Sequence, residues 1–243
     1  MNPDSRPVLL VSEGLEASAR AVWENREAFG SDPEVHVFSR ERKALTSGGA
    51  ALVVPWAQGG LDYTGTFFDA LSEGRISMVL PLLEHNDGTV QGLLEFAGVP
   101  YAGCGITGLI LARDPEYCSA VLGSLGLERA SDTEAPGTHV AVLGNGDLVT
   151  GTQGAPGAEV LARRVFRGLG LGGWALVEAV FEEGVFRWRS IQVQPDLGPG
   201  APFLEALAAR NLDLAAVLTR VLRWGQDRHA AEAGLKNHFK DKI

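Results

Sequence analysis

The chain has 243 residues, enough for one large domain or two small ones. Its hydrophobic content of 45% and charged content of 21% are typical of a globular protein that folds in water. The net charge of −9 gives no electrostatic basis for binding nucleic acid or an anionic membrane, and no apolar run reaches the length of a membrane helix.

The N-terminus and the cysteines indicate a cellular compartment. The first residues lead straight into a predicted strand and lack the form of a signal peptide. Cys104 and Cys118 lie inside predicted elements and have no metal-type spacing. We therefore expect a cytoplasmic protein with two buried free thiols.

Strand and helix patterns alternate over residues 1–127 and predict a doubly wound parallel sheet. Asn86 and Asp87 are the expected caps of a helix that ends at Gly98, and Asp114 is the expected cap of a later one. Short apolar runs predict strands at 7–11, 35–38, 51–55 and 76–80, the third of them central. Helical spacing predicts helices at 15–29, 64–71, 90–97, 106–112 and 115–125.

The pattern changes after residue 127. Residues 128–137 are polar, contain proline and glycine, and are predicted to form a linker. Residues 138–227 are predicted to form an α+β domain with an antiparallel sheet, and the polar residues 228–243 a frayed tail. The predicted strands are 138–143, 148–152, 174–181 and 185–194, and the predicted helices are 158–169, 204–209 and 214–222.

One long segment carries a family resemblance. Residues 87–105, DGTVQGLLEFAGVPYAGCG, are similar to the pattern DGTxQGxLExxGxPYxGxG of the N-terminal domain of D-alanine–D-alanine ligases, members of the ATP-grasp superfamily. Residues 140–145 (VAVLGN) and 163–170 (RRVFRGLG) resemble later family segments, and 192–200 (QVQPDLGPG) stands in place of its metal-binding ExNTxPG. The resemblance implies a parallel Rossmann-like N-terminal domain, an ATP-grasp C-terminal domain, and homodimers formed through the first domain.

The resemblance also shows what the chain lacks. An ATP-grasp ligase forms an acyl phosphate, and lysines, an arginine and Mg²⁺ balance the charge that develops. Pro115 and Ser119 stand where the family has two lysines, and no lysine occurs between Ala44 and Leu235. Leu127 is separated from Val140 by little more than a dozen residues, where the family has a central subdomain that holds the nucleotide. The resemblance therefore implies a truncated ATP-grasp domain.

The metal positions are altered as well. By the register of the resemblance, Leu176 replaces an arginine and Glu178 an aspartate, while Gln192 and Gln194 replace the Glu and Asn of the metal-binding pair. A neutral glutamine is a poor Mg²⁺ ligand. Glu178 remains as a lone carboxylate, either a metal ligand or a structural partner of an arginine, and we expect no metal site.

Three further positions belong to the substrate side of the resemblance. Glu16 is a candidate for the acid that receives a substrate ammonium, with Glu13 as the other possibility. His85 is either a ligand contact or a solvated loop histidine, and Asp87 lies beside it.

A separate motif, GxGxxG, spans 103–108 and lies between a predicted strand and a predicted helix. A dinucleotide site would have this form, but a helix follows where a strand ending in an acidic residue is required. The resemblance explains the first two glycines as a tight turn, so we expect no NAD.

Two functions compete. The first is a degenerate ligase-like protein without ligase activity and without a cofactor, which binds an authentic ligase or a small amino-acid-like ligand; in the latter case it could act as a sensor in the interdomain cleft. The second is an active ATP-dependent carboxylate–amine ligase with ATP and Mg²⁺ in a remodelled site. In that case the lysines would be replaced by Arg163, Arg164, Arg187 and Arg189.

Overall fold

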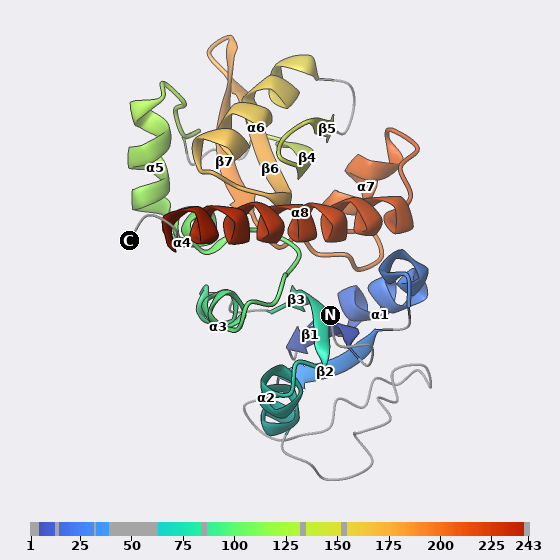
Figure 1. Cartoon of the computed structure of the whole chain (residues 1–243). Helices are drawn as coiled ribbons and strands as arrows, with labels where there is room; N and C mark the ends of the chain where they lie inside the picture. The colour runs from blue at the N-terminus through green and yellow to red at the C-terminus, as the bar shows by residue number, and fades with distance from the viewer. Residues whose placement is uncertain are drawn as a thin grey trace.

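A computed structural model describes residues 5–12, 15–31, 33–38, 63–83, 87–131, 135–151 and 155–240 (Figure 1). The strand predicted at 51–55 lies outside these ranges. Of Glu16, only the backbone is described.

The described strands of the first half form a parallel sheet in the order β2-β1-β3, as predicted. Its strands are β1 (Arg6–Ser12), β2 (Glu34–Phe38) and β3 (Ile76–Leu82). The helices around it are α1 (Glu16–Glu24), the 3₁₀ helix η1 (Arg26–Phe29), α2 (Tyr63–Ser72) and α3 (Thr89–Ala97). β1 and β3 are buried almost continuously, which is the pattern of parallel strands covered on both faces.

Helix boundaries follow local capping chemistry. The helix predicted at 15–29 divides at Asn25 into α1 and η1. Asp114 caps α5 (Pro115–Ser124) as predicted, because its Oδ1 accepts hydrogen bonds from the backbone N–H groups of Glu116 (2.9 Å) and Tyr117 (3.1 Å). At α3 the N-cap is Gly88, with a φ of 88° that favours glycine. Asp87 still contributes, since its Oδ1 accepts from the N–H of Thr89 at 2.9 Å.

The second half is an antiparallel sheet in the order β5-β4-β6-β7, with helices packed against it, as predicted. Its strands are β4 (Thr138–Gly144), β5 (Leu148–Gly151), β6 (Gly173–Glu182) and β7 (Val185–Gln192). Three helices complete this half: α6 (Pro156–Gly168), α7 (Pro202–Ala208) and α8 (Leu214–Lys240). The remaining helix of the first half is α4 (Ile106–Arg113).

Alternation along β6 divides the core. Ala175 and Val177 pack with α6, α5 and α4 on one face of the sheet. Trp174 and Leu176 face the other way and join a cluster that also contains β1, β3, α1, α7 and α8. The two halves are therefore joined by this second cluster, and Figure 1 shows α8 lying across the molecule between the two sheets. Within the described part of the chain, no helix combines the length and the apolar character needed to cross a membrane.

The prediction of a frayed polar tail from residue 228 is wrong, because α8 continues to Lys240. Arg228 holds this part of the helix: its Nη2 donates to the carbonyl oxygen of Tyr101 at 3.2 Å, and its Nε lies 3.8 Å from Glu232 Oε1. The local sequence does not indicate this part of the helix, because the residue that Arg228 contacts, Tyr101, lies in the first half of the chain.

The linker predicted at 128–137 begins as an ordered segment beside β7. The N–H of Ala130 donates to the carbonyl of Trp188 at 2.7 Å, and the N–H of Trp188 donates to the carbonyl of Glu128 at 3.3 Å. The indole Nε1 of Trp188 donates to the carbonyl of Leu127 at 3.2 Å. The connection therefore covers part of the exposed edge of the sheet.

Candidate functional site

The glycine-rich turn after β3 is packed tightly against the second half. Ala102 N–H donates to the carbonyl of Val79 at 2.8 Å, which ties the turn to β3. Gly103 has a φ of 90°, and a Cβ built at Gly173 would lie 2.7 Å from the Cα of Gly103. Two backbones meet here at a distance that only glycine allows. The GxGxxG segment thus supports a close contact between the halves, which accords with the tight turn implied by the resemblance.

Helix α8 covers the same turn from another direction. A Cβ at Gly225 would lie 2.3 Å from the carbonyl oxygen of Tyr101. The guanidinium Cζ of Arg228 lies 4.0 Å from the centre of the Tyr101 ring and 4.9 Å from that of Trp224. Burial raises the pKa of the Tyr101 hydroxyl, which donates to Glu95 Oε1 at 2.7 Å. A dinucleotide phosphate approaching the turn on this side would have to displace α8.

Glu178 has both carboxylate oxygens engaged. Arg189 Nη1 lies 3.0 Å from Oε1, and the Ser190 hydroxyl donates to Oε2 at 2.9 Å. The other end of the guanidinium donates from Nη2 to the carbonyl of Ala135 at 2.8 Å. A Cβ at Gly137 would lie 2.3 Å from Glu178 Oε1, so the connection between the halves covers the carboxylate closely. We call Glu178, Arg189, Ser190 and the segment 135–137 the Glu178 cluster.

The remaining positions on β6 and β7 make different contacts. Leu176 is 2% exposed and lies in the shared core, opposite Gln192 in the β6–β7 pairing. Gln192 is exposed at the end of β7. Gln194 donates from Nε2 to the carbonyl of Leu83 at 2.9 Å and accepts at Oε1 from the N–H of Leu83 at 3.0 Å. Its amide thus forms the same paired hydrogen bonds as a β-bridge and fastens the second half to the end of β3.

A second polar contact fastens the halves near α1. The hydroxyl of Ser18 donates to Asp196 Oδ1 at 2.8 Å and accepts from the N–H of Leu197 at 2.9 Å. Ser18 is 2% exposed, so its hydroxyl lies away from solvent. Sequence patterns did not indicate this pair, because serine on an amphipathic helix carries no signal of a distant partner.

The other predicted positions are not joined to the Glu178 cluster. α5 packs on α4 and α6, with Pro115 exposed and Ser119 half-buried, and no hydrogen bond described for the chain joins either residue to Glu178. Asp87 is exposed, and the Thr89 amide lowers the pKa of its carboxyl. His85 lies outside the described residues, as does the side chain of Glu16.

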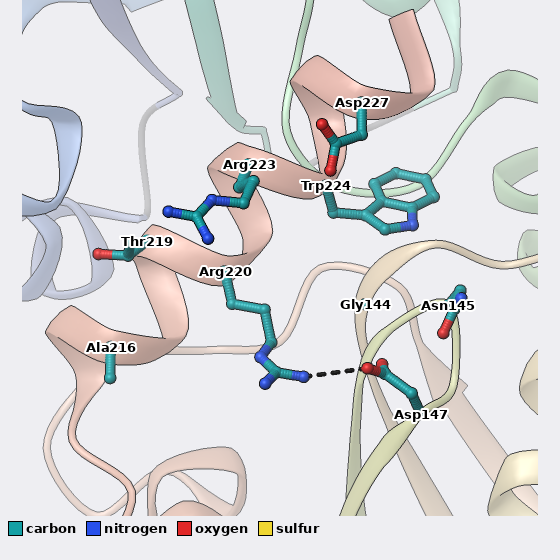
Figure 2. A pocket seen from close by; sticks show the side chains of 9 residues that line it. All are labelled: Gly144, Asn145, Asp147, Ala216, Thr219, Arg220, Arg223, Trp224 and Asp227. Atoms are coloured by element: carbon teal, nitrogen blue, oxygen red, sulfur yellow. Dashed lines mark hydrogen bonds and ion pairs between the residues drawn. The ribbon is translucent and has the colours of Figure 1, made fainter. Parts of the chain in front are cut away.

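A cavity that the sequence did not predict lies between the β4–β5 turn and α8. Its volume is about 420 Å³. Figure 2 shows the side chains that line it, which come from two elements far apart in the chain. The polar and aromatic ones are Asn145, Asp147, Thr219, Arg220, Arg223, Trp224 and Asp227. The sequence marked residues 144–147 only as a hairpin turn, and nothing in it links that turn to the exposed face of α8.

Metal ligation finds little support in the described ranges. No group of three His, Cys, Asp or Glu side chains converges there as a metal-ion ligand set. Mg²⁺ prefers carboxylate oxygens, and the Glu178 oxygens are directed to Arg189 and Ser190. The residues present therefore do not fit a magnesium–nucleotide site at this place.

No family model matches the chain. Among curated proteins, the D-alanine–D-alanine ligase of Bifidobacterium longum subsp. infantis is 47% identical over 62 residues, covering 24% of this chain and 16% of the relative. The D-alanine–D-alanine ligase of Frankia casuarinae is 43% identical over 81 residues, covering 32% of this chain and 19% of the relative. The matched part of the chain thus spans less than a quarter of the length of these relatives.

The structural likeness is more extensive. The D-alanine–D-alanine ligase of Coxiella burnetii superposes with a TM-score of 0.74 at 13% identity, covering 97% of this chain and 99% of that chain. The Bacillus anthracis enzyme complexed with ATP gives 0.64 at 11% identity, covering 94% and 99%. The fold is therefore that of the D-alanine–D-alanine ligases. The local sequence matches are to ligases of the same name, which supports the resemblance.

Proposed function

We propose that the chain is a D-alanine–D-alanine-ligase-like pseudoenzyme of the cytoplasm, without ATP-dependent ligase activity, that serves as a binding or scaffolding partner. The observation that carries this proposal is the closed Glu178 cluster. Arg189 supplies the positive charge beside Glu178, and the 135–137 segment covers it.

Binding of a magnesium ion at Glu178 would require this cluster to come apart. The carboxylate would have to exchange two hydrogen bonds for the ion, and the Arg189 guanidinium would then face a divalent cation of like charge. Glu178 and Arg189 side chains are only 17% and 24% exposed, so water would compensate the guanidinium poorly. The neighbouring Gln192 and Gln194 add no charge to attract the ion.

The arginines that could replace the missing lysines are held by other contacts. Arg163 Nε donates to the carbonyl of Gly146 at 3.0 Å, and Arg164 Nη2 donates to that of Leu125 at 3.2 Å. Arg187 Nε lies 3.1 Å from Glu128 Oε2 and its Nη2 lies 3.0 Å from Glu183 Oε2. Adding Arg189, all four arginines contact the fold itself, which weighs against the active-ligase alternative.

The chain between α5 and β4 supports the same proposal. α5 ends at Ser124, and Glu128 already pairs with Trp188 of β7. The resemblance implies a central nucleotide-holding subdomain in this interval. The described residues between Ser124 and Thr138 contain no helix or strand of their own beyond the single bridge at Arg129.

Nucleotide binding and turnover test the proposal directly. Isothermal titration with ATP·Mg²⁺ should give no heat of binding in the micromolar range, and no phosphate should be released with D-alanine or with a broad amino-acid panel. An authentic D-alanine–D-alanine ligase is the positive control. Micromolar binding of ATP·Mg²⁺, or turnover with any amino acid, would refute the pseudoenzyme.

An Arg189→Ala variant tests whether Arg189 blocks an otherwise intact metal site or whether the metal site is absent. If Arg189 merely excluded an otherwise intact metal site, its removal would restore Mg²⁺-dependent ATP binding. We expect no gain, because Gln192 and Gln194 remain neutral and no phosphate-binding lysine is introduced. Recovered binding would mean that the site retains ligase chemistry.

The partner is part of the proposal. By the resemblance, a second copy binds through the N-terminal domain, and an authentic ligase or a small amino-acid-like molecule is the further ligand. Light scattering gives the mass of the protein alone and its mass after mixing with an authentic ligase. A monomer in both cases would leave the small molecule as the remaining ligand.

A further inference from the structure

The cavity between the β4–β5 turn and α8 is separate from the Glu178 cluster and shares no residue with it. Its volume of about 420 Å³ is in the range of pockets that hold small organic molecules. One wall is the turn that carries Asn145 and Asp147, and the other is one face of α8 (Figure 2).

The charges of the lining balance. Arg220 and Arg223 contribute two positive charges, and Asp147 and Asp227 contribute two negative ones. A simple anion would be repelled by the carboxylates, and a metal cation by the guanidinium groups. A molecule that carries one ammonium and one carboxylate group complements both pairs. The indole of Trp224 adds an aromatic face to the lining, against which an apolar group can pack (Figure 2).

In the described part of the chain, two of these four charges are unpaired, and the other two form one exposed ion pair with each other. Among the described residues, neither Arg223 nor Asp227 takes part in an ion pair or a side-chain hydrogen bond, although they lie one helical turn apart. Arg220 and Asp147 form an ion pair at 3.1 Å across the cavity, with side chains 46% and 56% exposed. Exposed pairs of this kind are weak and exchange readily for another partner.

We propose that this cavity binds a small zwitterion of the amino-acid or short-peptide class. Arg223 binds the carboxylate, with Arg220 beside it, because a guanidinium matches a carboxylate in two hydrogen bonds. Asp227 binds the ammonium, and Trp224 contacts the apolar side chain. This inference gives the amino-acid-like ligand of the proposed function a binding site. Only the biological meaning of the site rests on that proposed function.

The test uses the dipeptide alanylalanine, in its L,L and D,D forms, and two blocked analogues. The N-acetylated form lacks the ammonium, and the C-terminal amide lacks the carboxylate. The readout is the indole N–H resonance of Trp224 in ¹H–¹⁵N spectra of the full chain, assigned with a Trp224→Phe variant. We expect a saturable shift with at least one dipeptide, and a loss of about tenfold or more in affinity for each blocked analogue.

Two variants assign the charges. Arg223→Ala should weaken the dipeptide about tenfold and leave the C-terminal amide unchanged. Asp227→Asn should weaken the dipeptide and leave the N-acetylated form unchanged. Both residues are exposed, so the fold should tolerate either change. Arg210→Ala is the matched control, because Arg210 is 53% exposed and pairs with Glu159 outside the cavity.

Three results would overturn the inference. The first is the absence of a saturable shift up to about 10 mM dipeptide, where even a weak site would fill. The second is equal affinity for the blocked and the free dipeptides. The third is equal weakening by Arg223→Ala and Arg210→Ala. Each outcome is independent of ATP binding, so failure here leaves the pseudoenzyme proposal standing, and turnover with ATP would refute that proposal without deciding this one.

Discussion

A Gly225→Ala substitution tests the packing of α8 against the glycine-rich turn. In an open helix, replacing glycine by alanine stabilises the fold by about 1 kcal/mol, because glycine loses more backbone entropy on folding. At Gly225 the added Cβ would lie 2.3 Å from the carbonyl oxygen of Tyr101 and 2.8 Å from Cε of Met78. The steric effect and the entropic effect therefore have opposite signs.

The steric effect should be the larger. The Tyr101 carbonyl cannot move freely, because Arg228 Nη2 donates to it at 3.2 Å and the adjacent Ala102 is bonded to β3. Overpacking of a tight contact costs about 1–3 kcal/mol, and because this carbonyl is fixed we expect the upper part of that range, about 2–3 kcal/mol. After the helical gain of about 1 kcal/mol, the expected net loss is about 1–2 kcal/mol. For a chain of this size that corresponds to a fall in Tm of about 2–8 °C.

The same helix contains its own control. Gly234 has no atom within 4 Å of a built Cβ, so Gly234→Ala should show only the helical effect and stabilise the fold by about 1 kcal/mol. Thermal and urea unfolding, followed by circular dichroism, measure both variants. If Gly225→Ala raises Tm as Gly234→Ala does, the packing of α8 against the glycine-rich turn is refuted. Contact with α8 would then not explain why the turn is rich in glycine.

Other contacts in the molecule lead to three more predictions. Gln194→Ala removes both hydrogen bonds to the Leu83 backbone and should lower the free energy of unfolding by about 1–2 kcal/mol in urea titrations, whereas an unchanged value would show that the amide does not fasten the halves. Burial raises the pKa of both thiols, Cys104 and Cys118, to about 11, so a thiol reagent at pH 8 should label them only after unfolding. Because the unfolded thiols ionise first, their contribution to stability should be lost as the pH rises from about 9 towards 11; labelling of the native protein would contradict this. Phe96 is 93% exposed on α3, and if the first domain forms the proposed homodimer there, Phe96→Glu should convert the dimer to a monomer in light scattering.

Elements with strong local chemistry were predictable. The hairpin between β4 and β5 follows from glycines at 144 and 146, whose φ values are 71° and 87°. The Asp114 cap follows from the Asp-Pro-Glu order, and the change from parallel to antiparallel sheet follows from the change in element pattern. Each of these depends on interactions within a few residues, which the sequence records directly.

The end of α8 could not be predicted in this way. Residues 228–240 have little apolar periodicity, and the contacts described for this stretch include those of Arg228 with the Tyr101–Gly103 turn, with Trp224 and with Glu232. A helix stabilised by two cation–π contacts and two backbone carbonyls has no hydrophobic stripe to mark it.

The candidate site shows the same division. Through the resemblance, the loss of charge at positions 176 and 192, and the survival of Glu178 alone, were evident from residue identity. The partner on Glu178 was foreseen only as an unspecified arginine. Only the folded chain shows that the Gln194 amide binds the Leu83 backbone and that residues 135–137 cover Glu178. The cavity at α8 was missed altogether, because Asp147 and Arg220 meet only after the chain folds.

The sequence by itself determined the two sheet types, the similarity to the D-alanine–D-alanine ligases and the positions at which this chain departs from their residues, since identity and short-range pattern carry that information. Only the tertiary structure decided what surrounds those positions: a guanidinium beside Glu178, the Gln194 amide on the Leu83 backbone, and a helix over the glycine turn. These choices depend on which distant groups come within hydrogen-bonding distance, and that is fixed by packing of the whole chain rather than by any local segment.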